Sequence, residues 1–156
     1  MPTRIAQSVR AERALPGGGR RIELEFGAER AAERVPAILL LPADGGAPAA
    51  GALLLHGYTS HKEQMAESVG RVLLGHGIAS LAIDLPLHGE RRGGMDAQAM
   101  RNPMALASAW RLAGDEARLA LGYLSARREV DAERLALVGY SMGSFLGVLV
   151  AAKERR

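Results

Sequence analysis

The chain has 156 residues, 48% hydrophobic and 24% charged, a balance that fits one globular domain and excludes an intrinsically disordered chain. Its net charge of +3 is small, and its 18 arginines and two lysines are scattered along the sequence, so we expect no nucleic-acid partner. Cysteine is absent, which excludes disulfides, thiolate catalysis and zinc–thiolate sites.

Neither end of the sequence nor its interior predicts contact with a membrane. Residues 1–15, MPTRIAQSVRAERAL, carry charges throughout and contain no apolar run of signal-peptide length. No stretch approaches the roughly 18 apolar residues of a membrane span. We therefore expect a cytoplasmic protein with no membrane partner.

The first part of the chain predicts strands near the edge of a sheet. A first strand is expected over about 5–10, before a PGGG turn. The segment RIELEF at 21–26 then alternates apolar and acidic side chains, which is the period of a half-buried strand. A short apolar run, VPAILLLP, follows at 35–42. We expect these leading strands to form an antiparallel edge.

The rest of the chain predicts buried strands that alternate with helices. The strands are apolar runs without a polar face: ALLLHG (52–57), IASLAIDLP (78–86) and RLALVGY (134–140). The helices are predicted over 62–75, from Met95 to about Arg128 with breaks near Asn102-Pro103 and Gly114, and from 142 onward. This alternation predicts an α/β fold, a mostly parallel sheet with helices on both faces and antiparallel N-terminal edge strands.

The segment Gly139-Tyr140-Ser141-Met142-Gly143 fits the G-x-S-x-G pattern of a nucleophile elbow. It lies between a predicted strand and a predicted helix, where a sharp turn would raise the serine hydroxyl above the carboxyl edge of the sheet. A Cβ at either glycine would collide with the neighbouring strand or helix. The N–H of Met142, at a helix N-terminus, would point to the place where an oxyanion develops. The alternative is an ordinary turn with an incidental serine.

Three motifs resemble the α/β-hydrolase family, most closely its dienelactone-hydrolase and prolyl-oligopeptidase-like serine esterases. They are HGYTSHKE from His56, DLPLHGER from Asp84 and DAERLALVGYSMG around Ser141, and the resemblance covers about residues 20–156. It implies that Ser141 attacks a carbonyl and that the backbone N–H groups of Tyr58 and Met142 form the oxyanion hole. It implies no cofactor and no metal.

All four histidines precede Ser141 in the sequence. The resemblance implies that His56 turns into the fold and braces its loop, and we expect His88 to brace its loop as well. His61 and His76 are expected at solvated helix positions. None of them forms a metal-binding pattern with a carboxylate.

The chain departs from the family after the elbow, because there the acid and the histidine of the triad follow the serine on later loops. No strand is predicted after the helix that begins at 142, so neither residue is present. We therefore expect a single, incomplete α/β-hydrolase domain over 1–156, truncated after the elbow helix. Two alternatives stay open: a non-catalytic remnant that binds a ligand or partner, and a working hydrolase whose base is His56, His88 or a residue of another chain.

The strand at 134–140 would then be an exposed apolar edge, which predicts self-association. The substrate implied by the resemblance is a small molecule with an ester or related acyl bond, cleaved through an acyl-serine. The segment 95–110 holds Met95, Met100, Met104 and Trp110. These residues would either line an acyl pocket or, as we favour, fill the interface between helix and sheet. Arg91 and Arg92 would either meet an acidic substrate or, as we favour, lie in solvent.

Overall fold

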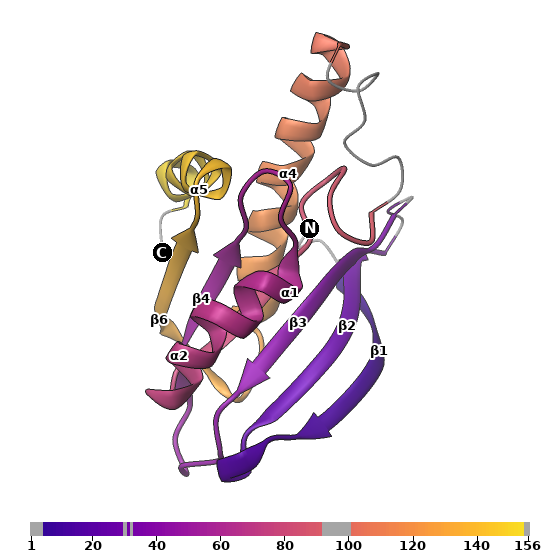
Figure 1. The fold of residues 1–156 in the computed structure, drawn as a ribbon. Helices are drawn as coiled ribbons and strands as arrows, with labels where there is room; N and C mark the ends of the chain where they lie inside the picture. Colours follow the sequence, from indigo (N-terminus) through magenta and orange to yellow (C-terminus); the bar gives the residue numbers. More distant parts are fainter. Residues whose placement is uncertain (1–4, 30, 32, 92–100, 155–156) are drawn as a thin grey trace.

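The computed structural model describes residues 5–29, 31, 33–91 and 101–154, which form a six-stranded sheet with helices on both faces (Figure 1). The strands are β1 (Ile5–Ala14), β2 (Arg20–Ala28), β3 (Val35–Leu41), β4 (Ala49–Leu55), β5 (Ala79–Ile83) and β6 (Val130–Gly139). A short helix, η1 (Pro16–Gly18), follows β1. The segments α1 (Lys62–Met65), the π-helical η2 (Ala66–Gly70) and α2 (Arg71–Gly75) form one continuous helical run. The last two helices are α4 (Pro103–Ser125) and α5 (Met142–Lys153).

The strand order is β1-β2-β3-β5-β4-β6, and the strand direction changes along it. The pairs β1–β2, β2–β3 and β3–β5 are antiparallel, whereas β4 is parallel to both β5 and β6. The expected α/β fold with antiparallel N-terminal strands is confirmed. The expectation of a mostly parallel sheet was imprecise, because β3 pairs with β5 in the middle of the sheet, and the apolar pattern of a strand does not reveal its partner.

Two apolar layers cover the sheet. One lies between the sheet and α4 and α5, and its largest members include Phe26, Leu39, Leu53 and Leu124. The other lies between the sheet and the helical run 62–75, and it includes Ile38, Leu40, Leu54 and Met65. Successive side chains of β3 and β4 enter opposite layers, so these strands are buried on both faces. This is what continuous apolar runs predict.

β6 lies at the end of the sheet and is the exposed edge that the sequence predicts. Its expected place at 134–140 is confirmed, although the strand begins earlier, at Val130. The prediction that it is buried on both faces is wrong, since most of its side chains are exposed or half-buried. An edge strand has only one strand neighbour, so an apolar sequence alone does not bury it.

α4 is one unbroken helix, and the predicted break near Gly114 is wrong. Asn102 caps it by accepting hydrogen bonds from the N–H groups of Met104 and Ala105, each 3.1 Å long, and Pro103 suits the first helical position. Gly114 costs about 1 kcal/mol in a helix interior, which the burial of neighbouring residues on the sheet can offset. The predicted start at Met95 lies outside the described residues.

No helix in the described part of the chain combines the length and the apolar character that crossing a bilayer requires.

Candidate active site

The loops that follow β4, β5 and β6 meet at one edge of the sheet. Leu55, the last residue of β4, pairs with Ile83 of β5 and with Gly139 of β6, so the three parallel strands end level with one another. The segments that follow these strands therefore start side by side. This carboxyl edge is where open α/β sheets bind their ligands.

The turn at Ser141 has a backbone conformation that L residues rarely adopt. Ser141 has φ 49° and ψ −114°, and the residue is exposed at the start of α5. Such a conformation costs about 1–3 kcal/mol and persists only where neighbouring contacts enforce it. Here the Tyr140 N–H donates to the Leu55 carbonyl at 3.0 Å, and the Gly143 N–H donates to the Tyr140 carbonyl at 2.9 Å.

The two glycines of the motif allow β6, α5 and β4 to approach closely. A Cβ on Gly139 would lie 2.4 Å from the Gly143 carbonyl oxygen, and a Cβ on Gly143 would lie 2.2 Å from the Leu55 carbonyl oxygen. The expected collisions are thus confirmed. One turn further along α5, a Cβ on Gly147 would lie 2.6 Å from Leu137 Cδ2. The small face of α5 therefore packs on the sheet, as the spacing predicts.

The loop after β4 lies directly against this turn. A Cβ on Gly57 would be 3.0 Å from Tyr140 Cδ1 and 3.4 Å from the Ser141 Cβ. Tyr58, the next residue, lines the same cavity as Met142. The structure therefore brings together the three residues that the sequence analysis selected: Tyr58, Ser141 and Met142.

His56 is fully buried, and both of its ring nitrogens are hydrogen-bonded. Its Nδ1 lies 2.7 Å from the Gly57 carbonyl oxygen, and its Nε2 accepts from the Leu85 N–H at 3.0 Å. Because a carbonyl only accepts, Nδ1 carries the proton of the neutral ring. Burial lowers the pKa of His56, which favours this neutral form. His56 thus braces its loop, as expected, and has no free nitrogen to act as a base.

The other histidines do not contact Ser141 either. His88 is buried with Nδ1 2.9 Å from the Pro86 carbonyl oxygen, so it braces its own loop as expected, while its Nε2 has no partner among the described residues. His61 and His76 are exposed as expected, although they flank the helical run rather than lie within it. Within the described residues, the Ser141 hydroxyl has no hydrogen bond to a histidine.

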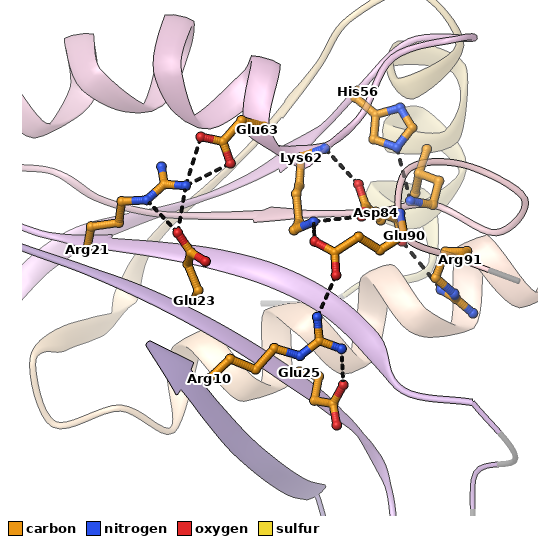
Figure 2. A network of polar contacts seen from close by, with 11 residues as sticks. Arg10, Arg21, Glu23, Glu25, His56, Lys62, Glu63, Asp84, Glu90 and Arg91 are labelled. Carbon is orange, nitrogen blue, oxygen red and sulfur yellow. Dashed lines mark hydrogen bonds and ion pairs between the residues drawn. The ribbon is translucent and has the colours of Figure 1, made fainter. Parts of the chain in front are cut away.

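A buried ion-pair network fixes the loop after β5 (Figure 2). Asp84 is fully buried; its Oδ1 accepts from the Lys62 backbone N–H at 2.8 Å, and its Oδ2 accepts from Lys62 Nζ at 2.9 Å. The Glu90 N–H also donates to Asp84 Oδ2, at 3.0 Å. The side chain of Glu90 also pairs with Arg10 of β1. Asp84 thereby joins the start of α1 to its own loop. In the sequence Asp84 begins the motif DLPLHGER, but its ion pair was not predicted, and the lysine of HGYTSHKE was the available signal.

Lys62 and Glu90 are both held in their charged forms within this network. Burial lowers the pKa of Lys62, but its hydrogen bonds to Glu90 and Asp84 outweigh this effect and raise the pKa above its ordinary 10.5. The hydrogen bond from Lys62 lowers the pKa of Glu90 below its ordinary 4.5. Groups held in this way stabilise a structure and do not exchange protons with a substrate near neutral pH.

Arg91 neither meets a substrate nor lies in solvent, so both interpretations from the sequence were wrong. Its side chain is fully buried and pairs with Glu116 of α4 at 2.8 Å and with Glu33 at 3.0 Å. A fully buried guanidinium needs such partners. Arg92 lies outside the described residues. Arg91 therefore anchors the loop after β5 to α4.

An apolar cavity of about 470 Å³ lies beside the Ser141 turn. Tyr58 and His88 line it from the loops and Met142 from the start of α5, and α4 forms the opposite wall. Trp110 packs on the core, as favoured, and also lines this cavity; that the cavity is an acyl pocket stays a prediction. Met104 is 75% exposed, and Met95 and Met100 lie outside the described residues. Among the described residues, no group of three potential ligands could hold a metal ion.

Comparison with known proteins agrees with this geometry. Residues 52–156 match the model of the alpha/beta hydrolase family. A search of curated proteins found no match. Solved structures do match, among them an acetyl xylan esterase from Paenibacillus sp. R4, with a TM-score of 0.75 and 19% identity over 100% of this chain and 52% of that one.

Two further solved structures also match nearly all of this chain with only part of their own length. An acetyl xylan esterase from Thermoanaerobacterium has a TM-score of 0.72 and 19% identity, covering 97% of this chain and 49% of that one. A cold-adapted esterase from an Arctic intertidal metagenomic library, solved as a complex with PEG, has a TM-score of 0.67 and 28% identity, covering 94% and 60%. The chain thus spans between 49% and 60% of the length of these three structures.

Proposed function

This chain belongs to the alpha/beta hydrolase family, and from that premise we propose that Ser141 is the nucleophile of a serine hydrolase acting on an ester or related acyl bond. The observation that carries the proposal is the strained turn, with φ 49° at Ser141, at the carboxyl edge of the sheet. A strained turn is expected where it positions the serine hydroxyl to attack a substrate, whereas a serine with no catalytic role gives no reason for the strain.

In this reaction the Ser141 Oγ attacks the carbonyl carbon while its proton passes to a general base. The alcohol leaves with a proton, and water then hydrolyses the acyl-serine. We propose that the N–H groups of Met142 and Tyr58 hold the oxyanion, because one lies at the start of α5 and the other in the loop beside the turn. A donor of this kind typically contributes about 2.7–4 kcal/mol of transition-state stabilisation. No cofactor is required.

The general base and the triad acid would come from polypeptide outside the described residues. A serine hydroxyl is a poor nucleophile without a base, and no histidine in the described part is hydrogen-bonded to it. The chain would then be the N-terminal portion of a hydrolase domain, since it spans 52% and 49% of two esterases with its fold. By itself it should have little or no activity.

Because no base contacts the Ser141 hydroxyl among the described residues, a second candidate is a non-catalytic module of the same fold. An apolar cavity of about 470 Å³ can bind a ligand without any reaction. For either candidate we propose a small-molecule partner and a cytoplasmic location. The scattered charges of the sequence support neither a nucleic-acid nor a membrane partner.

Labelling with a fluorophosphonate separates the two candidates. We expect the purified chain to react slowly or not at all. When imidazole in solution acts as the base, labelling of Ser141 should become at least about tenfold faster. This gain is expected to be smaller than the rate enhancement of about 10²–10⁴-fold that a positioned base gives. Intact-mass analysis measures the label. Ser141→Ala should lose it, whereas Ser144→Ala should keep it, because Ser144 is exposed and donates to the Gly139 carbonyl at 3.0 Å.

Two results would contradict parts of this proposal. Stoichiometric labelling without imidazole would show that the base lies within this chain or a second copy. No labelling with imidazole, from a protein that melts cooperatively, would favour the non-catalytic module.

We also propose that the isolated chain self-associates through the β6 edge and the outer face of α5. Phe145, Val148 and Leu149 on α5 are 72%, 70% and 49% exposed, and an unpaired strand edge beside an apolar surface favours association. Light scattering should show an average mass that rises above 16.5 kDa with concentration. The double variant Phe145→Glu/Val148→Glu should suppress the rise, whereas Val72→Glu, at a 63% exposed position on α2, should not. A monomer at every concentration would disprove self-association.

A further inference from the structure

We propose that the cavity beside Ser141 selects neutral esters with a hydrocarbon group next to the carbonyl, and that it rejects anionic and cationic ones. This inference rests on the proposed function, because it places the ester carbonyl at Ser141. It adds the substrate class, which neither the fold nor the comparisons give.

The position of the cavity connects it to the reacting group. Tyr58 and Met142 line the cavity, and they are also the residues whose N–H groups would hold the carbonyl oxygen. A carbonyl held there has one substituent directed toward the cavity. The opposite wall is a single face of α4, formed by Leu106, Ala109 and Ala113 at helical spacing, with Trp110 beside them. Alanine at two of these positions leaves the space that a hydrocarbon group would occupy.

The charges around the cavity indicate a neutral occupant. No aspartate, glutamate, lysine or arginine is among the described residues that line it. The nearby buried charges already have partners, since Asp84 pairs with Lys62 and Arg91 pairs with Glu116. Among the described residues that line the cavity, no cation is therefore available to a carboxylate and no anion to an ammonium group. Burying an unpaired charge is strongly unfavourable.

His88 also lines the cavity, from the loop after β5, and its Nε2 is buried without a hydrogen-bond partner among the described residues. Its Nδ1 lies 2.9 Å from the Pro86 carbonyl oxygen, so in the neutral ring Nδ1 donates and Nε2 is an acceptor. The neutral ring therefore offers a carboxylate no free N–H donor, because Nδ1 is already engaged with the Pro86 carbonyl.

Equilibrium binding of three small probes tests the inference: methyl butanoate, methyl hexanoate and the hexanoate anion, measured by ligand-observed NMR at neutral pH. Each added methylene that enters the cavity should raise affinity about fourfold. Methyl hexanoate, with two more methylenes, should therefore bind about sixteenfold tighter than methyl butanoate, and at least about tenfold tighter than hexanoate. Equal binding of hexanoate and its methyl ester would overturn the inference.

Two variants on α4 locate the binding site. Ala109→Leu places a larger side chain in the cavity and should weaken methyl hexanoate binding at least about tenfold. Ser108→Leu, one residue away and exposed, is the matched control and should bind as the parent chain does. If Ala109→Leu and Ser108→Leu change the affinity for methyl hexanoate equally, the ester binds outside this cavity. If Ala109→Leu does not fold, Trp110→Ala replaces it, and unchanged affinities for both esters in that variant would likewise overturn the inference.

The Ser141→Ala variant separates this inference from the proposed function. It should keep the full affinity for methyl hexanoate, because the cavity needs no nucleophile. Ester binding without any Ser141 labelling would mean that the proposed reaction is wrong while the cavity preference stands. Labelling of Ser141 without ester binding would mean that the proposed reaction stands while the cavity preference is wrong.

Discussion

Replacing Gly143 with alanine should lower the free energy of unfolding by about 3 kcal/mol, at the upper end of the usual cost of overpacking. The new Cβ would lie 2.2 Å from the Leu55 carbonyl oxygen and 2.7 Å from the His56 carbonyl oxygen. Both are backbone atoms, which cannot rotate away as the tip of a side chain can. Either α5 must move off the sheet or the end of β4 must shift, and both movements displace Met142 relative to Tyr58.

Thermal melting followed by circular dichroism measures this effect, and a loss of about 3 kcal/mol corresponds to about 6–12 °C in Tm for a domain of this size. Gly114→Ala in α4 is the matched control, because nothing lies within 4 Å of the position of its Cβ. That variant should gain about 0.5–1 kcal/mol, since alanine is the better helix former. The two substitutions are identical in chemistry and opposite in expected sign. A shift in the same direction for both would disprove the close approach at Gly143.

The Ser141 turn could be predicted from the sequence because its requirements are local. The two motif glycines, the strand before them and the apolar helix after them lie within one short stretch, 134–153. Gly139 meets backbone within this stretch, at Gly143, whereas Gly143 meets the Leu55 carbonyl of β4. The pattern that indicates the turn is therefore local, although one of its contacts is not. The same holds for the run 52–55, whose lack of any polar face is enough to predict a strand buried on both sides. The run 35–41 was predicted among the antiparallel edge strands, and its burial on both faces was not predicted.

The order of the strands and the pairing of buried charges could not be predicted in this way. Lys62 and Asp84 are 22 residues apart, and Arg91 and Glu116 are 25 apart. With 20 basic and 17 acidic side chains in the sequence, many pairings are compatible with composition, and only the fold selects among them. Arg21 illustrates this: it belongs to the polar face of RIELEF, yet it is 3% exposed.

The neighbours of Arg21 explain its burial. Glu63 and Glu67, on the helical run that covers this face of the sheet, accept from the guanidinium at 2.7 Å and 2.9 Å. A strand pattern shows that a face is polar, but it does not show that a charged helix will cover that face. The prediction of a half-buried strand near the sheet edge was therefore right for the strand and incomplete for its polar side.

Replacing Asp84 with alanine should cost about 3–5 kcal/mol, the range for removing one partner of a buried ion pair. Lys62, whose side chain is 10% exposed, would keep only Glu90, whose side chain is 52% exposed. The N–H groups of Lys62 and Glu90 would also lose the carboxylate that accepts from them. Glu12→Ala is the control, because its pair with Arg20 is exposed, with side chains 43% and 41% accessible, and should contribute less than about 1 kcal/mol.

Chemical denaturation of the two variants provides the comparison, and equal losses would show that the buried network does not stabilise the fold. Adding Lys62→Met to Asp84→Ala should recover part of the loss, since it removes the cation that was left with a single partner. The network also joins the start of α1, just after the Tyr58 loop, to the loop that carries His88. Loosening it should therefore weaken methyl hexanoate binding by the molecules that remain folded. Unchanged binding in folded Asp84→Ala would mean that the network stabilises the domain without positioning the cavity walls.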